Sequence, residues 1–241
     1  MSADDASIPA IALLAGGLAE RLRPLTEKTP KSLIAIAGEP FIAHQLRLVR
    51  AQGVHQVVIC AGYLWEQLRD FVADGSAFGL NVVYSLDGDK KLGTGGALKK
   101  ALPLLGGEFL VMYGDSYLPT PFQPVIRHFR QSGKEALMTV FRNQGKWDTS
   151  NVVFEGGEIR VYDKQKKTPD MSFIDYGLGL FRAESFAPYP ENATLDLADV
   201  YQDVLTRGQL AGFEVKERFY EIGSRQGIAE TNALFSKRTG T

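Results

Sequence analysis

Hydrophobic residues in the first half of the chain follow two alternating patterns. Apolar runs of about four to eight residues predict buried strands, and apolar positions three or four residues apart predict amphipathic helices. The strands are predicted at 11–15, 54–61, 81–86 and 109–113, and the helices at 41–50, 64–72 and 95–105. Strands that alternate with helices, and that are apolar along nearly their whole length, are typical of parallel sheets. We therefore predict an α/β fold with a doubly wound, mostly parallel sheet and helices on both faces.

The second half of the chain changes to a pattern that is richer in strands. Strands are predicted at 136–142, 173–181, 210–216 and 218–222, and helices at 122–130, 196–206 and 224–237. The segments 151–155 and 158–162 flank Gly156-Gly157, a dipeptide suited to the two-residue turn of a hairpin. Thr194 is the predicted N-cap of the helix at 196–206, and Gly208 marks its end. We therefore expect a small β-rich lobe beyond about residue 120, within a single domain that spans 1–241.

Composition and charge exclude several classes of protein. The 241 residues are 44% hydrophobic and 23% charged, which is ordinary for a globular protein with a core. The net charge of −1 provides no basic field for nucleic acid, and no apolar run approaches the length of a membrane span. The N-terminal segment is polar and acidic, unlike a signal peptide, so we expect a cytoplasmic protein. The one cysteine, Cys60, lies in an apolar run and is expected to be buried.

A glycine-rich turn follows the first predicted strand and is the strongest candidate for chemistry. Gly16 and Gly17 let the backbone turn sharply or approach a ligand closely. Arg21, Arg23 and Lys31 follow them, and fixed cations beside bare backbone N–H groups suit a polyphosphate. The spacing matches neither the P-loop, G-x-x-x-x-G-K-[ST], nor the dinucleotide fingerprint, G-x-G-x-x-G. We interpret the segment as a phosphate-binding loop of another kind.

The same segment resembles the signature of the sugar-1-phosphate nucleotidyltransferases. That signature reads A-G-G-x-x-x-R-L-x-P-L-T, followed by P-K-x-L and G-x-P. The matching residues, in order and without gaps, are Ala15-Gly16-Gly17, Arg21-Leu22, Pro24-Leu25-Thr26, Pro30-Lys31, Leu33 and Gly38-Glu39-Pro40. One departure is Ala19, where many members carry glycine. The resemblance implies transfer of a nucleotidyl group from an NTP to a sugar 1-phosphate, with release of pyrophosphate.

The resemblance also implies a fold and a division of labour. The fold of this family is Rossmann-like, of the glycosyltransferase-A type, with a β-rich sugar-binding lobe. In this chain the nucleotide-binding half is expected at about 1–120 and the sugar-binding half at about 121–241. The expected partners are therefore an NTP and a sugar 1-phosphate, with no nucleic acid and no membrane. Whether the chain forms a homo-oligomer stays open.

The resemblance assigns the catalytic roles to two cations and two carboxylates. Arg21 and Lys31 occupy the positions of family residues that contact the reacting phosphates. Asp115 follows the strand at 109–113, where the family places an aspartate that binds catalytic Mg²⁺. Glu221 stands where a second metal-binding aspartate is usual, and its longer side chain changes the geometry. The implied cofactor is Mg²⁺.

Further positions in the resemblance imply which residues meet the two substrates. Nucleotide contacts are expected from the first loop and from the turn L-G-T-G-G-A, at Leu13, Ala15, Gly16, Gly17, Leu92, Gly93, Thr94 and Gly95. Contacts with the sugar and its phosphate are expected from Asn151, Asp163, Lys164, Tyr176 and Gly177. The run at 164–167 is equally typical of a solvated loop. Asp196 and Asp199 are interpreted as charges that complement the start of a helix.

The reaction implied by the resemblance explains why no histidine or serine nucleophile is expected. A phosphate monoester has a second pKa of about 6, so the acceptor needs little help from a general base. The protein must instead supply charge neutralisation and alignment. The three histidines, His44, His55 and His128, are accordingly interpreted as structural.

Several substrates fit the short form of the family. The favoured pair is GTP with D-glycero-D-manno-heptose 1-phosphate, by similarity to the heptose 1-phosphate guanylyltransferases. The alternatives are UTP with N-acetylmuramate 1-phosphate, and a cytidylyltransferase that acts on another phosphorylated acceptor. A non-catalytic, nucleotide-sugar-binding regulatory subunit is the alternative of another class. It is disfavoured because Arg21, Lys31 and Asp115 are all present.

Overall fold

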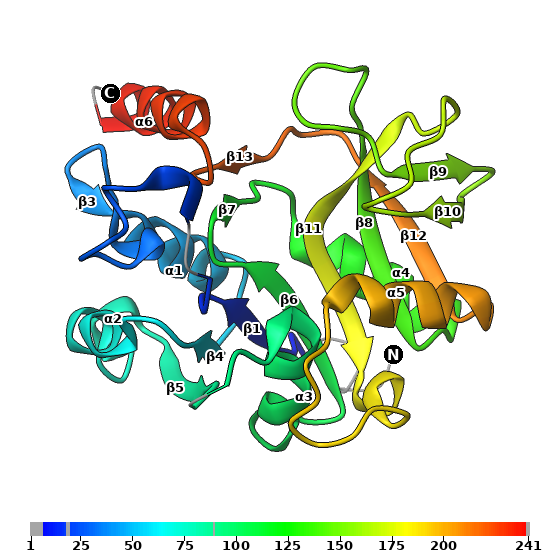
Figure 1. The fold of residues 1–241 in the computed structure, drawn as a ribbon, viewed down its shortest axis with the longest axis horizontal. Helices are drawn as coiled ribbons and strands as arrows, with labels where there is room; N and C mark the ends of the chain where they lie inside the picture. Colours follow the sequence, from blue (N-terminus) through cyan, green and yellow to red (C-terminus); the bar gives the residue numbers. More distant parts are fainter. Residues whose placement is uncertain (1–6, 18–19, 89, 240–241) are drawn as a thin grey trace.

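The centre of the fold is a parallel sheet of strands from the first half of the chain (Figure 1). The structure is a computed structural model that describes residues 7–17, 20–88 and 90–239, so the segment 1–6 and Ala19 lie outside the described residues. The strands are β1 (Ala10–Leu14), β4 (Gln56–Ala61), β5 (Asn81–Leu86) and β6 (Glu108–Tyr113). β1 lies between β4 and β6, and β5 pairs with β4. The four predicted parallel strands are confirmed.

Strands from the second half extend the same sheet. β11 (Phe173–Arg182) runs antiparallel to β6 and to β8 (Ala136–Arg142), and β12 (Leu210–Val215) runs parallel to β8. β9 (Val152–Glu155) and β10 (Glu158–Tyr162) form the predicted hairpin at one edge. Its turn residues Gly156 and Gly157 have φ angles of 60° and 83°, and positive φ at both positions is what a type I′ turn requires.

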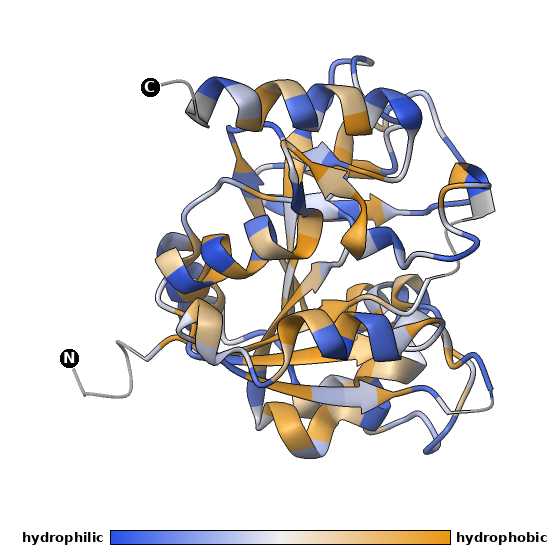
Figure 2. Cartoon of the chain, turned by 90° about the vertical axis from the view of Figure 1, so that its left-hand side faces the viewer, coloured by the Kyte–Doolittle hydropathy of each residue, from blue (hydrophilic) through white to orange (hydrophobic). Residues whose placement is uncertain are grey.

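Helices cover both faces of the sheet. α1 (Phe41–Ala51), α2 (Trp65–Val72) and α4 (Phe122–Ser132) pack on one face, and α3 (Gly93–Leu105) and α5 (Leu197–Thr206) pack on the other. Ile11 and Leu13 of β1 point into the first layer and Ala12 into the second, because successive side chains of a strand alternate. Figure 2 shows hydrophobic positions gathered on the sheet and polar positions on the outer sides of the helices. The predicted doubly wound α/β class is confirmed.

Three very short strands escaped the sequence analysis, and a fourth is shorter than predicted, because two residues carry no hydrophobic period. β2 (Ala35–Ile36) pairs with β3 (Glu39–Pro40), and β7 (Ser116–Tyr117) pairs with β13 (Tyr220–Glu221). The strand predicted at 218–222 is therefore shorter than expected. α6 (Arg225–Thr239) follows β13 and packs Phe235 against Tyr117 and Ile36 in a third apolar cluster. None of the described helices is both long and apolar enough to span a membrane.

The N-cap of α5 differs from the prediction. Asp196, not Thr194, precedes the first helical residue, and its carboxylate accepts a hydrogen bond from Ala198 N at 2.8 Å. The Asp199 carboxylate in turn accepts from Asp196 N at 3.3 Å, which completes a capping box. Thr194 instead donates its hydroxyl to Lys91 O at 3.4 Å. Asp196 and Asp199 complement the helix start, as the sequence indicated.

We expect Asp196→Ala to lower the free energy of unfolding by about 1 kcal/mol, because the first turn of α5 loses its side-chain acceptor. Urea denaturation followed by circular dichroism measures the change. Asp170→Ala, at an exposed aspartate in a turn outside the helices, is the control and should leave the midpoint unchanged. Equal midpoints for the two variants would contradict the assignment of Asp196 as the cap.

Candidate active site

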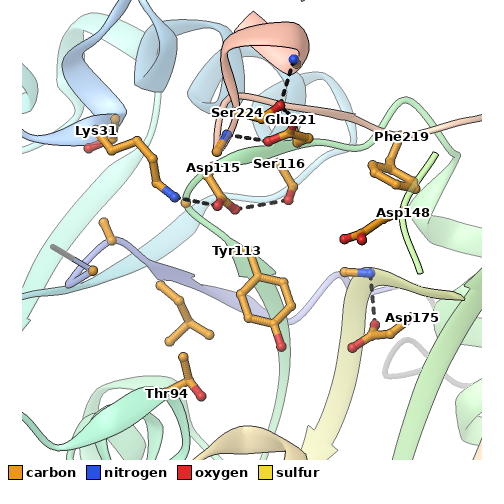
Figure 3. A pocket seen from close by; sticks show the side chains of 18 of the residues that line it. Lys31, Thr94, Tyr113, Asp115, Ser116, Asp148, Asp175, Phe219, Glu221 and Ser224 are labelled. Carbon is orange, nitrogen blue, oxygen red and sulfur yellow. Dashed lines mark hydrogen bonds and ion pairs between the residues drawn. The ribbon is translucent and has the colours of Figure 1, made fainter. Parts of the chain in front are cut away.

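A cleft of about 1090 Å³ opens at the carboxyl ends of the parallel strands (Figure 3). Its lining comes from the segments that follow β1, β5 and β6, from residues 146–148 between β8 and β9, from the first half of β11, and from the segment around β13. Ligands of open α/β sheets bind in this position, and cavities for small molecules measure roughly 300–1,000 Å³. The cleft is therefore large enough for a substrate of nucleotide size.

The glycine loop after β1 forms one wall of the cleft. Ala15 N donates to Cys60 O at 2.8 Å, which anchors the start of the loop on β4. A Cβ atom on Gly16 would lie 3.4 Å from Asp87 Oδ2, whereas one on Gly17 would meet nothing within 4 Å. Gly16 therefore packs closely against the protein, and Gly17 faces open space.

The two predicted phosphate-binding cations lie on short 3₁₀ helices behind this loop. Arg21 belongs to Glu20–Leu22 and Lys31 to Lys31–Leu33, and both side chains line the cleft. The segment between them is tied to the start of α2: Tyr63 Oη donates to Glu27 O at 2.8 Å, and Gln67 Nε2 donates to Lys28 O at 3.0 Å. These two hydrogen bonds hold the segment between Arg21 and Lys31 against the start of α2, at the side of the cleft that both cations line.

Asp115 and Glu221 are brought side by side by the β7–β13 pair. Glu221 is opposite Ser116 in the ladder, and Ile222 N donates to Asp115 O at 2.9 Å. Lys31 Nζ forms an ion pair with Asp115 Oδ2 at 2.6 Å, between side chains that are 21% and 30% exposed. Figure 3 shows the two carboxylates and the lysine at the same side of the cleft. Two residues more than a hundred positions apart thus share one site.

The geometry of these carboxylates fits a divalent cation. A Cβ atom placed on Gly223 would lie 2.9 Å from Glu221 Oε2, 3.4 Å from Asp115 Oδ2 and 3.8 Å from Lys31 Nζ. Both carboxylates and the Lys31 ammonium therefore converge on the same point beside Gly223. Glu221 is held in place because its carboxylate accepts hydrogen bonds from Gly223 N and, at 2.5 Å, from Ser224 Oγ. Mg²⁺ commonly binds through one or two carboxylates plus substrate phosphates and water, which is the donor set available here.

No further acidic or histidine ligand completes this pair within the described parts of the chain, where no group of three such residues could hold a metal. The remaining ligands would have to come from substrate and solvent. Asp115 and Glu221 could therefore hold Mg²⁺ together with oxygens of the substrate phosphates and of water.

The second glycine-rich turn contributes less to the cleft than the sequence suggested. Gly93 and Thr94 line the cleft, but Gly95 N and Gly96 N both donate to Leu195 O, at 2.8 and 3.1 Å. A Cβ atom on Gly96 would lie 2.3 Å from Ala193 O. These glycines at the start of α3 thus make room for the chain's own segment 193–196, and their N–H groups are already bonded.

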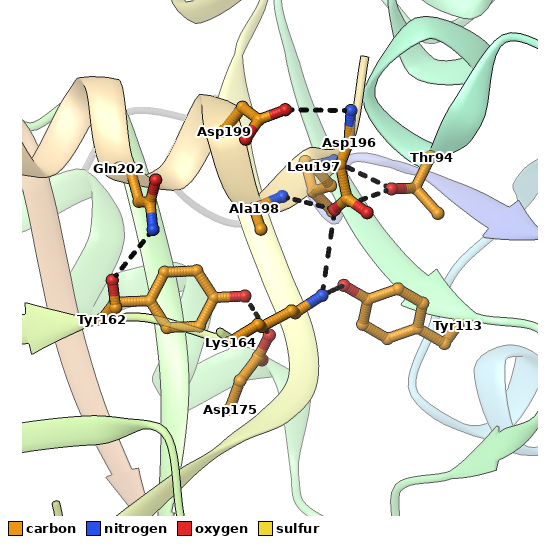
Figure 4. Close-up of polar contacts among 10 residues, drawn as sticks. All are labelled: Thr94, Tyr113, Tyr162, Lys164, Asp175, Asp196, Leu197, Ala198, Asp199 and Gln202. Carbon is orange, nitrogen blue, oxygen red and sulfur yellow. Dashed lines mark hydrogen bonds and ion pairs between the residues drawn. The ribbon is translucent and has the colours of Figure 1, made fainter. Parts of the chain in front are cut away.

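A partly buried acidic group, Asp175, lines the cleft, and Figure 4 shows its polar contacts. The Asp175 carboxylate accepts from Gly177 N at 3.0 Å and from Tyr162 Oη at 3.4 Å. Burial raises its pKa, and the nearby Lys164 ammonium works in the opposite direction. Lys164 Nζ lies 3.4 Å from Tyr113 Oη, so this lysine reaches the edge of the site from the loop that follows β10.

The structure gathers most of the predicted site residues into this cleft. Those that line it are Ala15, Gly16, Gly17, Arg21, Lys31, Gly93, Thr94, Asp115, Tyr176, Gly177 and Glu221. Those that do not are Leu13, Leu92, Gly95, Asn151, Asp163 and Lys164. Asp163 bonds to the backbone of its own turn, accepting from Gln165 N at 2.7 Å, and Asn151 accepts from Asp175 N at 2.9 Å. Both side chains therefore support the loops around the site from outside the cleft.

Several lining residues were missed by the sequence analysis. They include Asp87, Lys91, Tyr113, Lys146, Trp147, Asp148, Arg218, Gln226 and Glu230. Asp87 follows β5 as Asp115 follows β6, so the end of a predicted parallel strand was a usable signal. Burial raises the pKa of Asp87.

His44, His128 and Cys60, which were interpreted as structural, pack against other rings or are buried. His44 Nε2 is 2.9 Å from Ile36 O and its ring stacks on Phe235, and the His128 ring packs on Phe213. No histidine is among the described residues that line the cleft. Burial raises the pKa of Cys60 to about 12, so its thiol stays protonated and inert although it borders the cleft.

The sequence of the chain and its fold both match known proteins. Residues 11–237 match the family described as nucleotidyl transferase. This chain belongs to the nucleotidyl transferase family. The resemblance found in the glycine loop is thereby confirmed at the level of the family, and the protein is an enzyme of that family.

Individual relatives of this nucleotidyl transferase cover nearly all of its length. It is 28% identical over 228 residues to an N-acetylmuramate α-1-phosphate uridylyltransferase of Neisseria meningitidis, a match that covers 92% of this chain and 96% of the relative. It is 26% identical over 231 residues to a mannose-1-phosphate guanyltransferase of Gibberella zeae, but spans only 63% of that longer protein. Its fold is similar to that of a candidate glucose-1-phosphate thymidylyltransferase from Bacillus anthracis, with a TM-score of 0.83, 22% identity and 95% of each chain covered.

Proposed function

We propose that this nucleotidyl transferase joins the nucleoside monophosphate of an NTP to a sugar 1-phosphate and releases pyrophosphate. The observation that carries the proposal is the ring of groups around one cleft: the glycine loop, Arg21 and Lys31 face the carboxylates Asp115 and Glu221. Cations beside open backbone suit a triphosphate, and the paired carboxylates suit the metal that accompanies it.

The residues of the cleft account for the chemistry without a nucleophilic side chain. The acceptor phosphate attacks the α-phosphorus, and its second pKa of about 6 leaves it mostly dianionic at neutral pH. Arg21 and Lys31 neutralise charge on the reacting and departing phosphates, and Gly17 lets them approach the backbone. Mg²⁺ held by Asp115 and Glu221 would supply further charge neutralisation. The walls formed by Asp148, Asp175 and Gly177 orient the acceptor.

The proposal includes a division of labour between the halves of the chain. The nucleotide is bound mainly by residues of about 1–120 and the sugar by residues of about 121–241, as in the sequence-based expectation. Glu221 is the exception, since it belongs to the second half and lies beside Asp115. The two substrates thus meet where the β7–β13 pair joins the halves.

Two substrate pairs are proposed. UTP with N-acetylmuramate 1-phosphate is supported by the name of the Neisseria meningitidis relative, which matches along nearly its whole length. GTP with D-glycero-D-manno-heptose 1-phosphate is supported for its nucleotide by the name of the guanyltransferase relative. The heptose itself rests on the similarity of the sequence to short heptose-specific members.

The experiment that tests the proposal is pyrophosphate release in the presence of Mg²⁺. The four common NTPs and dTTP are each combined with the 1-phosphates of mannose, glucose, manno-heptose and N-acetylmuramate, and with phosphocholine. Turnover with one pair is the expected result and names both substrates. A chain that binds a nucleotide-sugar but turns over no pair would instead be a regulatory subunit.

Gly17→Ala separates binding at the glycine loop from folding. The new Cβ would meet no atom within 4 Å, so the thermal midpoint should not change. A triphosphate that lies against the loop would be obstructed, and we expect its KM to rise about tenfold, a loss of about 1.4 kcal/mol of binding. Gly107→Ala, which also meets nothing within 4 Å and lies outside the cleft, is the matched control. An unchanged KM in Gly17→Ala would show that the phosphates bind elsewhere.

A further inference from the structure

The loop 143–150, between β8 and β9, forms a wall of the cleft that no sequence motif indicated. Asn143 is 1% exposed and organises the loop. Its Oδ1 accepts from Trp147 N at 3.2 Å, and its Nδ2 donates to Ser150 Oγ at 3.2 Å and to Asp148 O. This arrangement presents Trp147 and Asp148 to the cleft, although Trp147 is 39% exposed.

This wall stands on the side of the cleft where the acceptor is proposed to bind. The backbone at both ends of the loop is bonded to the start of β11, through Asn143 N to Ser172 O at 3.1 Å and Asn151 N to Phe173 O at 2.9 Å. Figure 3 shows Asp148 near Asp175 and away from Lys31 and Thr94. A shift of the loop would therefore change the acceptor side without moving the glycine loop.

Arg218 joins this wall to the segment that carries Glu221. Its Cζ lies 3.5 Å from the ring centroid of Trp147 and 4.4 Å from that of Tyr220, so the guanidinium contacts two aromatic rings. Its Nη2 also forms an ion pair with Glu230 Oε2 of α6 at 2.6 Å, and this hydrogen bond lowers the pKa of Glu230. One side chain thus ties together the loop 143–150, the approach to β13 and α6.

A planar guanidinium suits this position better than an ammonium would. Arginine can stack on aromatic faces while its edge bonds a carboxylate, whereas lysine presents a compact charge on a flexible stem. Lysine at position 218 would keep an ion pair with Glu230 and lose the stacking on Trp147. The two roles of Arg218 can therefore be separated by one substitution.

We propose that Arg218 is a positioning residue for the acceptor, which it serves by holding Trp147 and the loop 143–150 against the strand that carries Glu221. The proposal rests on the proposed nucleotidyl transfer, because it assigns the loop to the sugar 1-phosphate. Arg218 acts through Trp147 and Asp148 and takes no part in the reaction itself.

The test compares Arg218→Lys and Trp147→Ala with the parent enzyme in steady-state kinetics. We expect the KM for the sugar 1-phosphate to rise about tenfold in both variants, with the KM for the NTP changed less than about twofold. Arg142→Lys is the matched control: its Cζ lies 4.6 Å from the Phe173 ring and its Nε 3.8 Å from Glu214 Oε1, but Arg142 does not line the cleft. This control should change neither KM.

A second measurement follows the stack itself, without turnover. The chain has two tryptophans, so Trp65→Phe leaves Trp147 as the only fluorophore of its kind. In that background, Arg218→Lys should increase quenching of Trp147 by acrylamide, and the sugar 1-phosphate should protect Trp147 in the enzyme that retains Arg218. If Arg218→Lys left the quenching of Trp147 unchanged, the proposed role of the stacking between Arg218 and Trp147 would be wrong.

The outcomes distinguish this inference from the function on which it rests. Equal increases in both KM values, or increased quenching with an unchanged KM for the acceptor, would overturn the positioning role while nucleotidyl transfer stands. A parent enzyme that releases no pyrophosphate with any substrate pair would contradict both proposals.

Discussion

Asp115→Asn is expected to reduce pyrophosphate release by about a thousandfold or more while leaving the fold intact. The amide keeps the size of the side chain but removes the charge that would hold a divalent cation, and metal ions supply several kcal/mol of charge stabilisation in such reactions. The ion pair with Lys31 is also lost. Because both side chains are partly exposed, at 21% and 30%, that loss should cost at most about 1 kcal/mol of stability.

The control for Asp115→Asn is Asp203→Asn. Asp203 is also ion-paired, with Arg207 Nε at 3.1 Å, but it lies on α5 outside the cleft. Its variant should keep full activity. Pyrophosphate release is measured at saturating substrates, and thermal unfolding reports the fold. If Asp115→Asn released pyrophosphate at the parent rate, Asp115 would have to be removed from the metal site.

Gly114→Ala should disable the enzyme by a different route. A Cβ atom at this position would lie 2.7 Å from Leu14 O and 3.1 Å from Ala15 Cα, both in the backbone at the end of β1. Neither atom can move without shifting the glycine loop away from Asp115. Such overpacking typically costs about 1–3 kcal/mol of stability. We expect activity to fall about a hundredfold or more, since displacements near 1 Å can have effects of that size.

Gly107→Ala provides the comparison for Gly114→Ala. It adds the same methyl group at the other end of β6, where a Cβ would meet no atom within 4 Å. Activity and the urea midpoint of this variant should match the parent. Parent-like kinetics in Gly114→Ala would contradict the close coupling of the glycine loop to the end of β6.

The parts of this protein that the sequence predicts are those with local signals. The apolar runs of β1 and β4 are buried on both faces, so their pattern does not depend on partners elsewhere in the chain. Gly16-Gly17 and Asp115 follow such runs directly, and the topology of a parallel sheet then brings them to the same edge. The glycine loop and Asp115 were therefore within reach of sequence analysis.

The parts that escaped prediction depend on contacts between distant segments. Gly95 and Gly96 had the pattern of a ligand site, but segment 193–196 of the chain fills the space beside them. The sequence of the turn contains no sign of this distant contact. Arg218 gains its role from Trp147 and Glu230, which lie on other elements. The N-cap of α5 fell on Asp196 because Asp199 completes a capping box with it, a reciprocity that Thr194 could not offer.

The measurement that tests the central claim most directly is the stoichiometry of products from an NTP and a sugar 1-phosphate. With Mg²⁺ and the productive pair, the account predicts equal amounts of pyrophosphate and nucleotide-sugar, formed only when both substrates are present. Anion-exchange chromatography with mass detection quantifies both products. Pyrophosphate released without the acceptor, with free nucleoside monophosphate as the second product, would contradict transfer to a sugar 1-phosphate.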